Sequence, residues 1–570
     1  MYILGLSAFE HDSAAAIIGD GGVIAAIEEA KLVRTRSIDG IPRRAIQFCL
    51  DQTGIKWPDV HRIAIASRPA RAWSRVILMR TRLAPVAPVS SIYFVNKASG
   101  EFGRELNNFR IIAGLSGLPR EWVQGFDHHL SHAASAYFAS PFDRALIVTL
   151  DERGDGRCGF AGAAQGTRIH NIAEIPLPNS LAWFYSQITK LIGFEAHSDE
   201  HKTQWLSTNG EPVFTDLFIS MLRRAPQAPP HLQSKYFERD FAADLSFSGE
   251  FYRRLGITRD SVPNLDPSMR ASIAASLQQA CTKIVVEWID SLRRQTGERN
   301  LCLAGGLFLN PLLVAAVEEH AGFENVFVQP AAGNEGTALG AAWLAWHEAS
   351  ADLRVAPLSS LYLGPSYSNE QIKRVLDNCK ASYRWCNSED QKVDETLRLL
   401  QAGRIVAWFQ GPAEFGPRAL GNRSLLASPW APYVTDNLND FVKHREPYRP
   451  FALSVPAEVC HDYFDCSPNA RFMTTMAKPA TKMRKLLEPI PSRFVAGDKV
   501  RLNVVAKEDN PLFWKLLKCS GERGPAPILV NTSFNLFGEP LVVTPRDAVR
   551  SYFCSGVDAL VAGNFLLTKK

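Results

Sequence analysis

The densest group of chemically useful side chains lies between Glu414 and Phe451, where cations alternate with glycines and prolines. This stretch reads EFGPRALGNRSLLASPWAPYVTDNLNDFVKHREPYRPF. Its cations are Arg418, Arg423, Lys443, Arg445 and Arg449. Because glycine and proline predict loops, backbone N–H groups and guanidinium groups can converge there and pair with phosphate oxygens. The alternative is a solvated basic patch, but the Gly-Pro-Arg and Glu-Pro-x-Arg-Pro-Phe punctuation argues against it. The stretch predicts an anion pocket.

A second group has the residue types of a metal site. His128 and His132 are four residues apart in a run that looks helical, so they share one helix face. Asp151 ends the next apolar strand and opens a glycine turn. Two imidazoles and a carboxylate suit iron, zinc or manganese better than calcium. Histidines that only cap or pack the helix remain the alternative.

Two glycine turns predict a nucleotide cleft. Gly305-Gly306 and Gly333–Gly336 each follow a predicted strand and precede a predicted helix, where phosphates can bind. Tight packing of strand on helix would explain the same glycines. His11, in the first polar turn, is a candidate base facing that cleft. Near the C-terminus, Asn531–Asn535 is predicted to follow a strand and either to hold a phosphate or amide or to form an ordinary polar turn.

The elements that must position these groups alternate strand and helix. Residues 2–7 and the run AAAIIGDGGVIAAIEE that follows a polar turn predict three strands, the last two joined by an Asp-Gly-Gly hairpin. Residues 144–162 repeat this pattern, which suggests a duplicated lobe. Residues 271–295 predict a long helix. Regular patterning lapses at 350–368, where we place the main domain boundary, and both sides of it look α/β.

Composition excludes several classes of protein. The chain has 570 residues, of which 46% are hydrophobic and 21% charged, so two to four soluble domains are expected. No apolar run is long enough to span a bilayer. Ten cysteines without C-x-x-C pairs and an N-terminus without signal-peptide features predict a reducing, cytoplasmic location. A net charge of +5 gives no warrant for a nucleic-acid partner.

Six segments together resemble the O-carbamoyltransferase family, which includes NodU-type nodulation proteins and the cephem and tobramycin carbamoyltransferases. They are HHLSHAASAYFASPFD, LCLAGGLFLN, QPAAGNEGTALGAA, WFQGPAEFGPRALGNRSLLA, KHREPYRPFA and ILVNTSFNLFGEPLV, and they cover nearly the whole chain. The resemblance implies an actin-like ATPase fold, related to threonylcarbamoyl-transferring proteins, for residues 1–355. It implies a YrdC-like open twisted sheet for residues 365–570.

The resemblance also implies a two-step reaction. The C-terminal domain would combine carbamoyl phosphate with ATP into carbamoyl adenylate. The N-terminal domain would then transfer the carbamoyl group to a hydroxyl of a small-molecule acceptor and release AMP. The implied cofactors are ATP, with Mg²⁺, and a divalent Fe, Zn or Mn ion.

The resemblance assigns roles to individual residues. Those matching the basic residues of the adenylate-forming cavity are Arg418, Lys443, Arg449 and Arg501. Ser533 and Asn535 match its polar ligands, and Gly305, Gly306 and Asn310 match the nucleotide-contacting turn. His128, His132 and Asp151 match metal ligands, with Asn334 at the fourth ligand position. His11 matches the histidine that takes the acceptor's proton.

The sequence departs from the family pattern in four places. Gly333-Asn334-Glu335-Gly336 replaces Gly-Asp-x-Gly, so an uncharged amide or Glu335 stands where an acidic ligand is expected. Glu152 replaces the glycine after Asp151. EHKTQWLSTNG, with Trp205 in place of a glycine, replaces E-G-K-V-M-G-L-A-P-Y-G, and VAGDKVR replaces V-D-G-T-A-R.

These departures leave the transfer step more open than adenylate formation. Our first hypothesis is an ATP-dependent O-carbamoyltransferase of antibiotic-type small-molecule biosynthesis. Transfer to an amine and a nucleotide-binding partner protein without activity are the alternatives, and transfer to tRNA is disfavoured by the low net charge. The acceptor pocket would be built from loops such as 68–110 and 205–265, which do not identify the acceptor. The oligomeric state stays open, with a homodimer as one option.

Overall fold

The chain folds into two compact units that interleave along the sequence. The structure, a computed structural model, describes residues 1–8, 12–20, 22–36, 38, 40–83, 88–223, 225–238, 247–350, 355–490 and 494–569. The first unit comprises Met1–Val23, Asp39–Pro42 and Gly54–Pro357. The second comprises Ile24–Ile38, Arg43–Thr53 and Leu358–Lys570. The predicted domain limits, 1–355 and 365–570, stay a prediction.

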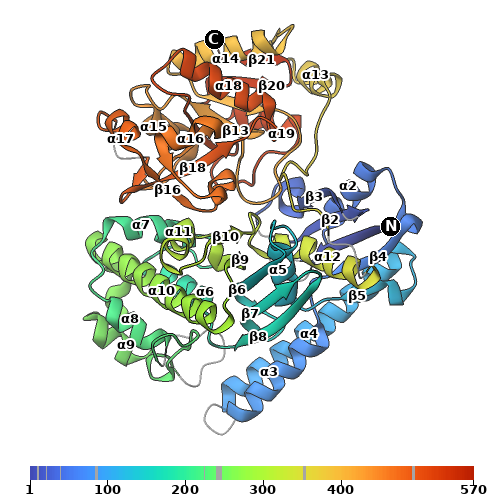
Figure 1. Ribbon diagram of the computed structural model, residues 1–570, viewed down its shortest axis with the longest axis vertical. Coiled ribbons are helices and arrows are strands. Elements are labelled where there is room, and N and C mark those ends of the chain that lie inside the picture. The colour runs from blue at the N-terminus through green and yellow to red at the C-terminus, as the bar shows by residue number, and fades with distance from the viewer. Residues whose placement is uncertain are drawn as a thin grey trace. The chain divides into compact units, whose positions relative to one another are not determined.

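Two five-stranded sheets share one strand order (Figure 1). The first has the order β3-β2-β1-β4-β5 and the second β10-β9-β6-β7-β8. The first strand of each sheet pairs antiparallel with its successor and parallel with the fourth. The strands are β1 (Tyr2–Ser7), β2 (Ala14–Gly19), β3 (Gly22–Glu28), β4 (Val60–Ile65), β5 (Val123–Gly125), β6 (Arg144–Gly154), β7 (Arg157–Gln165), β8 (Arg168–Pro176), β9 (Asn300–Ala304) and β10 (Asn325–Val328). The predicted duplication is confirmed, and the shared order agrees with the expected actin-like fold.

Helices pack closely on these sheets because glycines allow it. α12 (Thr337–Ala349) lies so near β1 that a Cβ on Gly5 would stand 1.9 Å from the carbonyl oxygen of Ala338. A Cβ on Gly340 would stand 1.8 Å from the carbonyl oxygen of Ser131 in α5 (His128–Tyr137). These contacts hold α5, which carries the histidine pair, in a fixed position.

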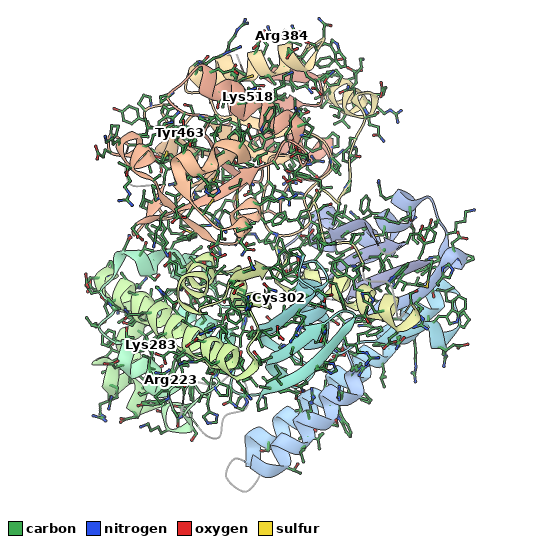
Figure 2. The ribbon with its side chains drawn as sticks, viewed as in Figure 1. Arg223, Lys283, Cys302, Arg384, Tyr463 and Lys518 are labelled. Carbon is green, nitrogen blue, oxygen red and sulfur yellow. The ribbon has the colours of Figure 1, made fainter. Side chains whose placement is uncertain are left out.

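The other helices of the first unit complete its layers. They are α3 (Pro69–Leu83), α4 (Pro88–Ser116), α6 (Leu181–Leu191), α7 (Glu200–Leu206), α8 (Thr215–Leu222), α9 (Gly249–Leu255), α10 (Pro267–Thr296) and α11 (Pro311–His320). The predicted helix at 271–295 is confirmed within α10, whose apolar side chains join a core with β6 and β9. Cys302 in β9 is buried in the sheet (Figure 2). No helix among the described residues is both long and apolar enough to cross a membrane.

The second unit is a mixed sheet covered on both faces. Its strand order is β11-β21-β20-β12-β13-β19-β14-β18-β16-β15, with β17 beside β18. The strands are β11 (Arg384–Trp385), β12 (Val406–Phe409), β13 (Arg423–Ala427), β14 (Ala452–Pro456), β15 (Phe464–Asp465), β16 (Met476–Pro479), β17 (Val495–Ala496), β18 (Lys499–Val505), β19 (Leu529–Ser533), β20 (Ala559–Ala562) and β21 (Phe565–Thr568). The C-terminal half is α/β, as predicted.

Alternate residues of β12 enter two separate cores. Val406 and Trp408 pack with α14 (Glu389–Gln401) and α18 (Pro511–Glu522), whereas Ala407 and Phe409 pack with α13 (Asn369–Asn378) and α19 (Pro545–Phe553). This alternation is that of a strand covered on both faces. Smaller helices are α15 (Val434–Leu438), α16 (Cys460–Tyr463) and α17 (Thr481–Leu487).

One boundary prediction near the second site is wrong. Asn531 and Ser533 were expected to follow a strand, but β19 continues through Ser533. Its register with β13 pairs Ser533 with Ser424 and Asn531 with Leu426, so backbone hydrogen bonds extend the strand through these polar residues. The second unit also contains two helices from the N-terminal part of the sequence, α1 (Glu29–Val33) and α2 (Arg43–Thr53).

Candidate functional sites

Two buried histidines and a buried aspartate meet in the first unit. α5 begins at His128, and His132 follows one turn later on the same face. The Nε2 atoms of the two rings lie 3.1 Å apart. Asp151 Oδ2 lies 3.3 Å from His128 Nε2 and 3.4 Å from His132 Nε2. The three potential ligand atoms therefore lie within 4.8 Å of one another.

Acidic side chains fix the start of α5. Asp127 is the N-cap, and its Oδ1 accepts the N–H of Leu130 at 3.1 Å. The buried guanidinium of Arg157 pairs with Asp127. Asp155 Oδ2 accepts the N–H of His128 at 2.8 Å. The sequence carried an N-cap signal at Asp127, directly before the histidine pair, but none for Asp155 or Arg157.

Glycines aim the carboxylate and one imidazole. The N–H of Gly306 donates to Asp151 Oδ1 at 3.0 Å, which leaves Oδ2 facing the two rings. A Cβ on Gly306 would stand 2.9 Å from Asp151 Oδ1, and one on Gly154 would stand 2.0 Å from His128 Cδ2. Gly305 has φ +96°, a conformation that glycine adopts easily. The Gly305-Gly306 turn therefore shapes the histidine–aspartate cluster directly.

The other predicted residues of this unit have defined places. Asn334 is buried, and its side chain lies near enough to His132 to raise the pKa of that ring, which burial lowers. Asn310 caps α11, since its Oδ1 accepts the N–H groups of Leu312 and Leu313 at 3.1 Å. His11, the predicted acceptor base, lies outside the described residues, so its role stays a prediction.

The protonation states favour metal binding by this cluster. Burial lowers the pKa of His132 from its ordinary value of 6.5, against the effect of its hydrogen bond with Asp151, so a neutral imidazole is available. Burial alone would raise the pKa of Asp151, but hydrogen bonds with His128 and His132 hold it well below 3.8. Two imidazoles and one carboxylate, all buried, fit a transition metal such as Zn, Fe or Mn.

In the second unit, Lys443 joins two polar residues that were expected beside it. Its Nζ contacts the carbonyl oxygen of Ser533, and it lies 3.3 Å from Ser533 Oγ and 2.7 Å from Asn535 Oδ1. Burial lowers the pKa of Lys443 well below its ordinary value, and the nearby charges of Arg445, Arg449 and Arg36 lower it further. The predicted Lys443, Ser533 and Asn535 therefore form one group.

The arginines gather beside this group. Burial lowers the pKa of Arg501 well below its ordinary value, and the positive charges of Arg418, Arg449 and Arg445 add to that effect in this order. Burial and Arg449 likewise lower the pKa of Arg445 to about 9. Such mutual lowering means that the cations lie close enough to repel one another. A phosphate-bearing ligand would relieve that repulsion, so this group is a candidate anion site.

Two arginines of the opening stretch have separate structural contacts. Arg423 is fully buried, lies 3.9 Å from the ring centre of Phe409, and donates to the carbonyl of Pro365 at 3.0 Å. Arg445 donates to Asn439 Oδ1 at 2.8 Å and lies 4.0 Å from the centre of the Phe451 ring. Unlike Arg423, Arg445 also places its charge near Lys443 and Arg501. Arg36, from the N-terminal part of the chain, also places its charge near Lys443, and no sequence signal pointed to it.

The comparison with known proteins assigns the chain to a family. The family model Carbamoyltransferase N-terminus matches residues 2–343, and Carbamoyltransferase C-terminus matches residues 397–569. The chain therefore belongs to the carbamoyltransferase family, as the sequence resemblance predicted.

Individual relatives agree over most of the chain. An uncharacterized Synechocystis protein is 33% identical, with 100% of this chain and 97% of the relative covered. Nodulation protein NolNO of Sinorhizobium fredii is 31% identical, with 99% of this chain and 79% of the relative covered. Nodulation protein U of Rhizobium tropici is 26% identical, with 98% of this chain and 95% of the relative covered. Among solved structures, component A of the Acidaminococcus fermentans (R)-2-hydroxyglutaryl-CoA dehydratase is similar to part of this chain. The match covers 61% of this chain and 99% of the component A chain, with 15% identity and a TM-score of 0.35.

Proposed function

We propose that this protein is an ATP-dependent O-carbamoyltransferase that acts in two half-reactions. In the second unit, carbamoyl phosphate, water and ATP give carbamoyl adenylate, phosphate and pyrophosphate. In the first unit, the hydroxyl oxygen of a small-molecule acceptor attacks the carbamoyl carbon, and AMP leaves with the electrons of the broken C–O bond. The observation that carries the proposal is the group of mutually repelling cations around Lys443 in a chain of the carbamoyltransferase family.

The first half-reaction needs such a group of cations. Carbamoyl phosphate and ATP are both polyanions, so their approach is opposed by strong repulsion unless fixed positive charges surround them. Arg418, Arg449 and Arg501 supply guanidinium groups that bind phosphate oxygens in pairs, and Lys443 supplies a point charge. Ser533 and Asn535 hold the Lys443 ammonium through oxygen acceptors. Mg²⁺ would accompany the ATP.

The second half-reaction belongs to the histidine–aspartate cluster. His128, His132 and Asp151 would hold a divalent ion, with the amide oxygen of Asn334 or the carboxylate of Glu335 beside them. When bound, the ion would neutralise the adenylate phosphate and polarise the carbamoyl group. Gly305, Gly306 and Asn310 would border the nucleotide. His11 would take the proton of the acceptor hydroxyl.

The partners follow from this reaction. They are carbamoyl phosphate, ATP and a small hydroxylated acceptor, with neither nucleic acid nor membrane required, and the protein would act in the cytoplasm. The buried metal-ligand set and the cation cluster together favour a working enzyme over an inactive binding partner. The acceptor pocket sets the choice between hydroxyl and amine, and a hydroxyl is the acceptor class that the family resemblance implies.

Pyrophosphate release tests the first half-reaction. The full-length protein, incubated with carbamoyl phosphate, ATP and Mg²⁺ but without an acceptor, should release pyrophosphate in an amount that depends on both substrates. Lys443→Ala should abolish this release, because the point charge inside the cluster is lost. Lys485→Ala, which changes an exposed lysine of the same unit, should leave it unchanged. Release that is absent in the natural protein, or equal in Lys443→Ala, would contradict the proposal.

A further inference from the structure

A short N-terminal segment holds the first loop of the anion site. Lys31 Nζ donates to the carbonyl oxygens of Glu414 and Gly416, each at 2.7 Å. Glu28 Oε1 accepts the N–H of Gly416 at 2.7 Å and pairs with Lys31 Nζ at 2.9 Å. Both side chains are buried, and all these residues belong to the second compact unit. The ion pair therefore fixes the backbone of residues 414–416.

The loop fixed in this way is the one that carries Arg418. Glu414 Oε1 accepts the N–H groups of Leu420, Asn422 and Arg423 at 2.8, 2.9 and 3.1 Å. The side chain of Glu414 thus closes residues 414–423 into a tight loop around its own carboxylate. Since Lys31 and Glu28 hold the start of this loop, they determine where Arg418, near its middle, is presented.

The same segment also holds the second loop of the site. Arg34 donates to the carbonyl oxygen of Leu541 at 2.6 Å and to Glu539 Oε2 at 2.9 Å. The carbonyl oxygen of Glu539 accepts from Asn535 Nδ2 at 2.8 Å. Asn535 Oδ1 in turn lies 2.7 Å from Lys443 Nζ. Arg34 is therefore linked to Lys443 through two intervening residues, Glu539 and Asn535.

The spacing of the three charged residues explains how one short segment reaches both loops. Glu28 precedes α1, Lys31 lies within it, and Arg34 follows it with φ +63°, a left-handed conformation that ends the helix. Three-residue steps keep side chains on one helix face. The helix ends at this left-handed residue, and the Arg34 guanidinium contacts residues 539 and 541.

We propose that Glu28, Lys31 and Arg34 are positioning residues for the anion site of the second unit, setting the places of Arg418 and Lys443 without touching substrate. This inference rests on the proposed function of that site. Displacing a binding group by about 1 Å costs up to about 100-fold in rate even when the mutation is remote. Loss of the segment's contacts should therefore damage adenylate formation while the fold persists.

Variants of the full-length protein test this. Lys31→Met alone leaves the buried Glu28 carboxylate without its cation, so the double variant Glu28→Gln/Lys31→Met removes both charges together. Arg34→Gln tests the second loop separately. Thr35→Ala, an exposed neighbour on the same segment, is the matched control, and Lys31→Arg is the conservative replacement.

Three measurements separate positioning from general destabilisation. Hydrogen exchange should speed up at the amides of Gly416, Leu420 and Asn422 in the double variant, but not at β12 or β20. Calorimetric binding of inorganic pyrophosphate should weaken about tenfold or more, corresponding to about 1.4 kcal/mol. The rate of pyrophosphate release should fall, with partial recovery in Lys31→Arg and no change in Thr35→Ala.

The outcomes distinguish this inference from the proposed function. If the natural protein releases no pyrophosphate, the proposed function fails, whereas exchange and pyrophosphate binding still judge the positioning role. Unchanged loop exchange and unchanged pyrophosphate affinity in the folded double variant and in Arg34→Gln would overturn the inference. Exchange that rises uniformly across the second unit would also overturn it, because the segment would then support the fold as a whole.

Discussion

Replacing Gly154 with alanine should disable the histidine–aspartate cluster without substituting any of its three residues. The added Cβ would stand 2.0 Å from Cδ2, 2.3 Å from Cγ and 2.6 Å from Nε2 of His128. Carbon atoms rest at separations of about 3.5 Å. The ring must therefore move by about 1.5 Å, because Gly154 is part of β6 and its backbone is held by the sheet.

That movement is large compared with what a metal bond tolerates. Zinc–nitrogen bonds are about 2.0–2.1 Å long and sites tolerate deviations of about 0.2 Å. A shift of about 1.5 Å would remove His128 from the ligand set. The loss of a supporting residue alone costs about 10- to 100-fold in metal affinity. We therefore expect the Gly154→Ala protein to bind Zn²⁺ at least about 100-fold more weakly than the natural protein does.

Competition with a chromophoric chelator would measure the affinity of the natural and variant proteins for Zn²⁺. Gly103→Ala is the matched control, since a Cβ there meets nothing within 4 Å. Circular dichroism would show that both variants fold. Equal zinc affinity in folded Gly154→Ala and natural protein would refute the reasoning, because His128 could not then be a ligand in this position.

Three further predictions follow from other residues. The pKa of Lys443 in the folded protein lies well below 10.5, so between these two values the unfolded state binds more protons and the free energy of unfolding should rise with pH. Denaturant titrations at a series of alkaline pH values should show a smaller rise of this free energy with pH in Lys443→Met. An equal rise in both proteins would contradict the buried location of Lys443. Asn334→Asp adds a negative charge beside the histidine pair and should tighten Zn²⁺ binding in the same chelator assay, with unchanged or weaker binding counting against a ligand role. Cys460 Sγ and Cys466 Sγ lie 3.2 Å apart, so treatment with a small disulfide reagent should oxidise them to a disulfide bond within one chain. Peptide mapping that still finds both thiols open to alkylation after this treatment would disprove the prediction.

The sequence predicted the local groups better than their supports. Spacing alone indicated that His128 and His132 share a helix face. The repeated pattern of strand, polar turn and strand indicated the duplicated sheets. Lys443, Ser533 and Asn535 were expected in one cavity from the family resemblance, and the structure brings them together. The predicted end of β19 was wrong because backbone pairing with β13 outweighs the turn preference of Asn531 and Ser533.

Residues that act through long-range contacts gave no local signal. Lys31 is separated from Glu414 by 383 residues, and Arg34 from Leu541 by 507. Their neighbours in sequence form a helix of five residues, which predicts nothing about carbonyl groups so far along the chain. Asp155 likewise accepts the N–H of His128 only because β6 and α5 are brought together by tertiary packing.

The interleaving of the two units has a consequence for how such a protein can be recombined. Residues 24–38 belong to the second unit, yet they are encoded between segments of the first. A chimera joined at Pro357 would combine the Lys31 and Arg34 of one parent with the loops of the other. A functional exchange of the C-terminal half between relatives therefore needs residues 24–38 to be exchanged as well. The gene segment for residues 24–38 should accordingly be inherited together with the segment for the C-terminal half.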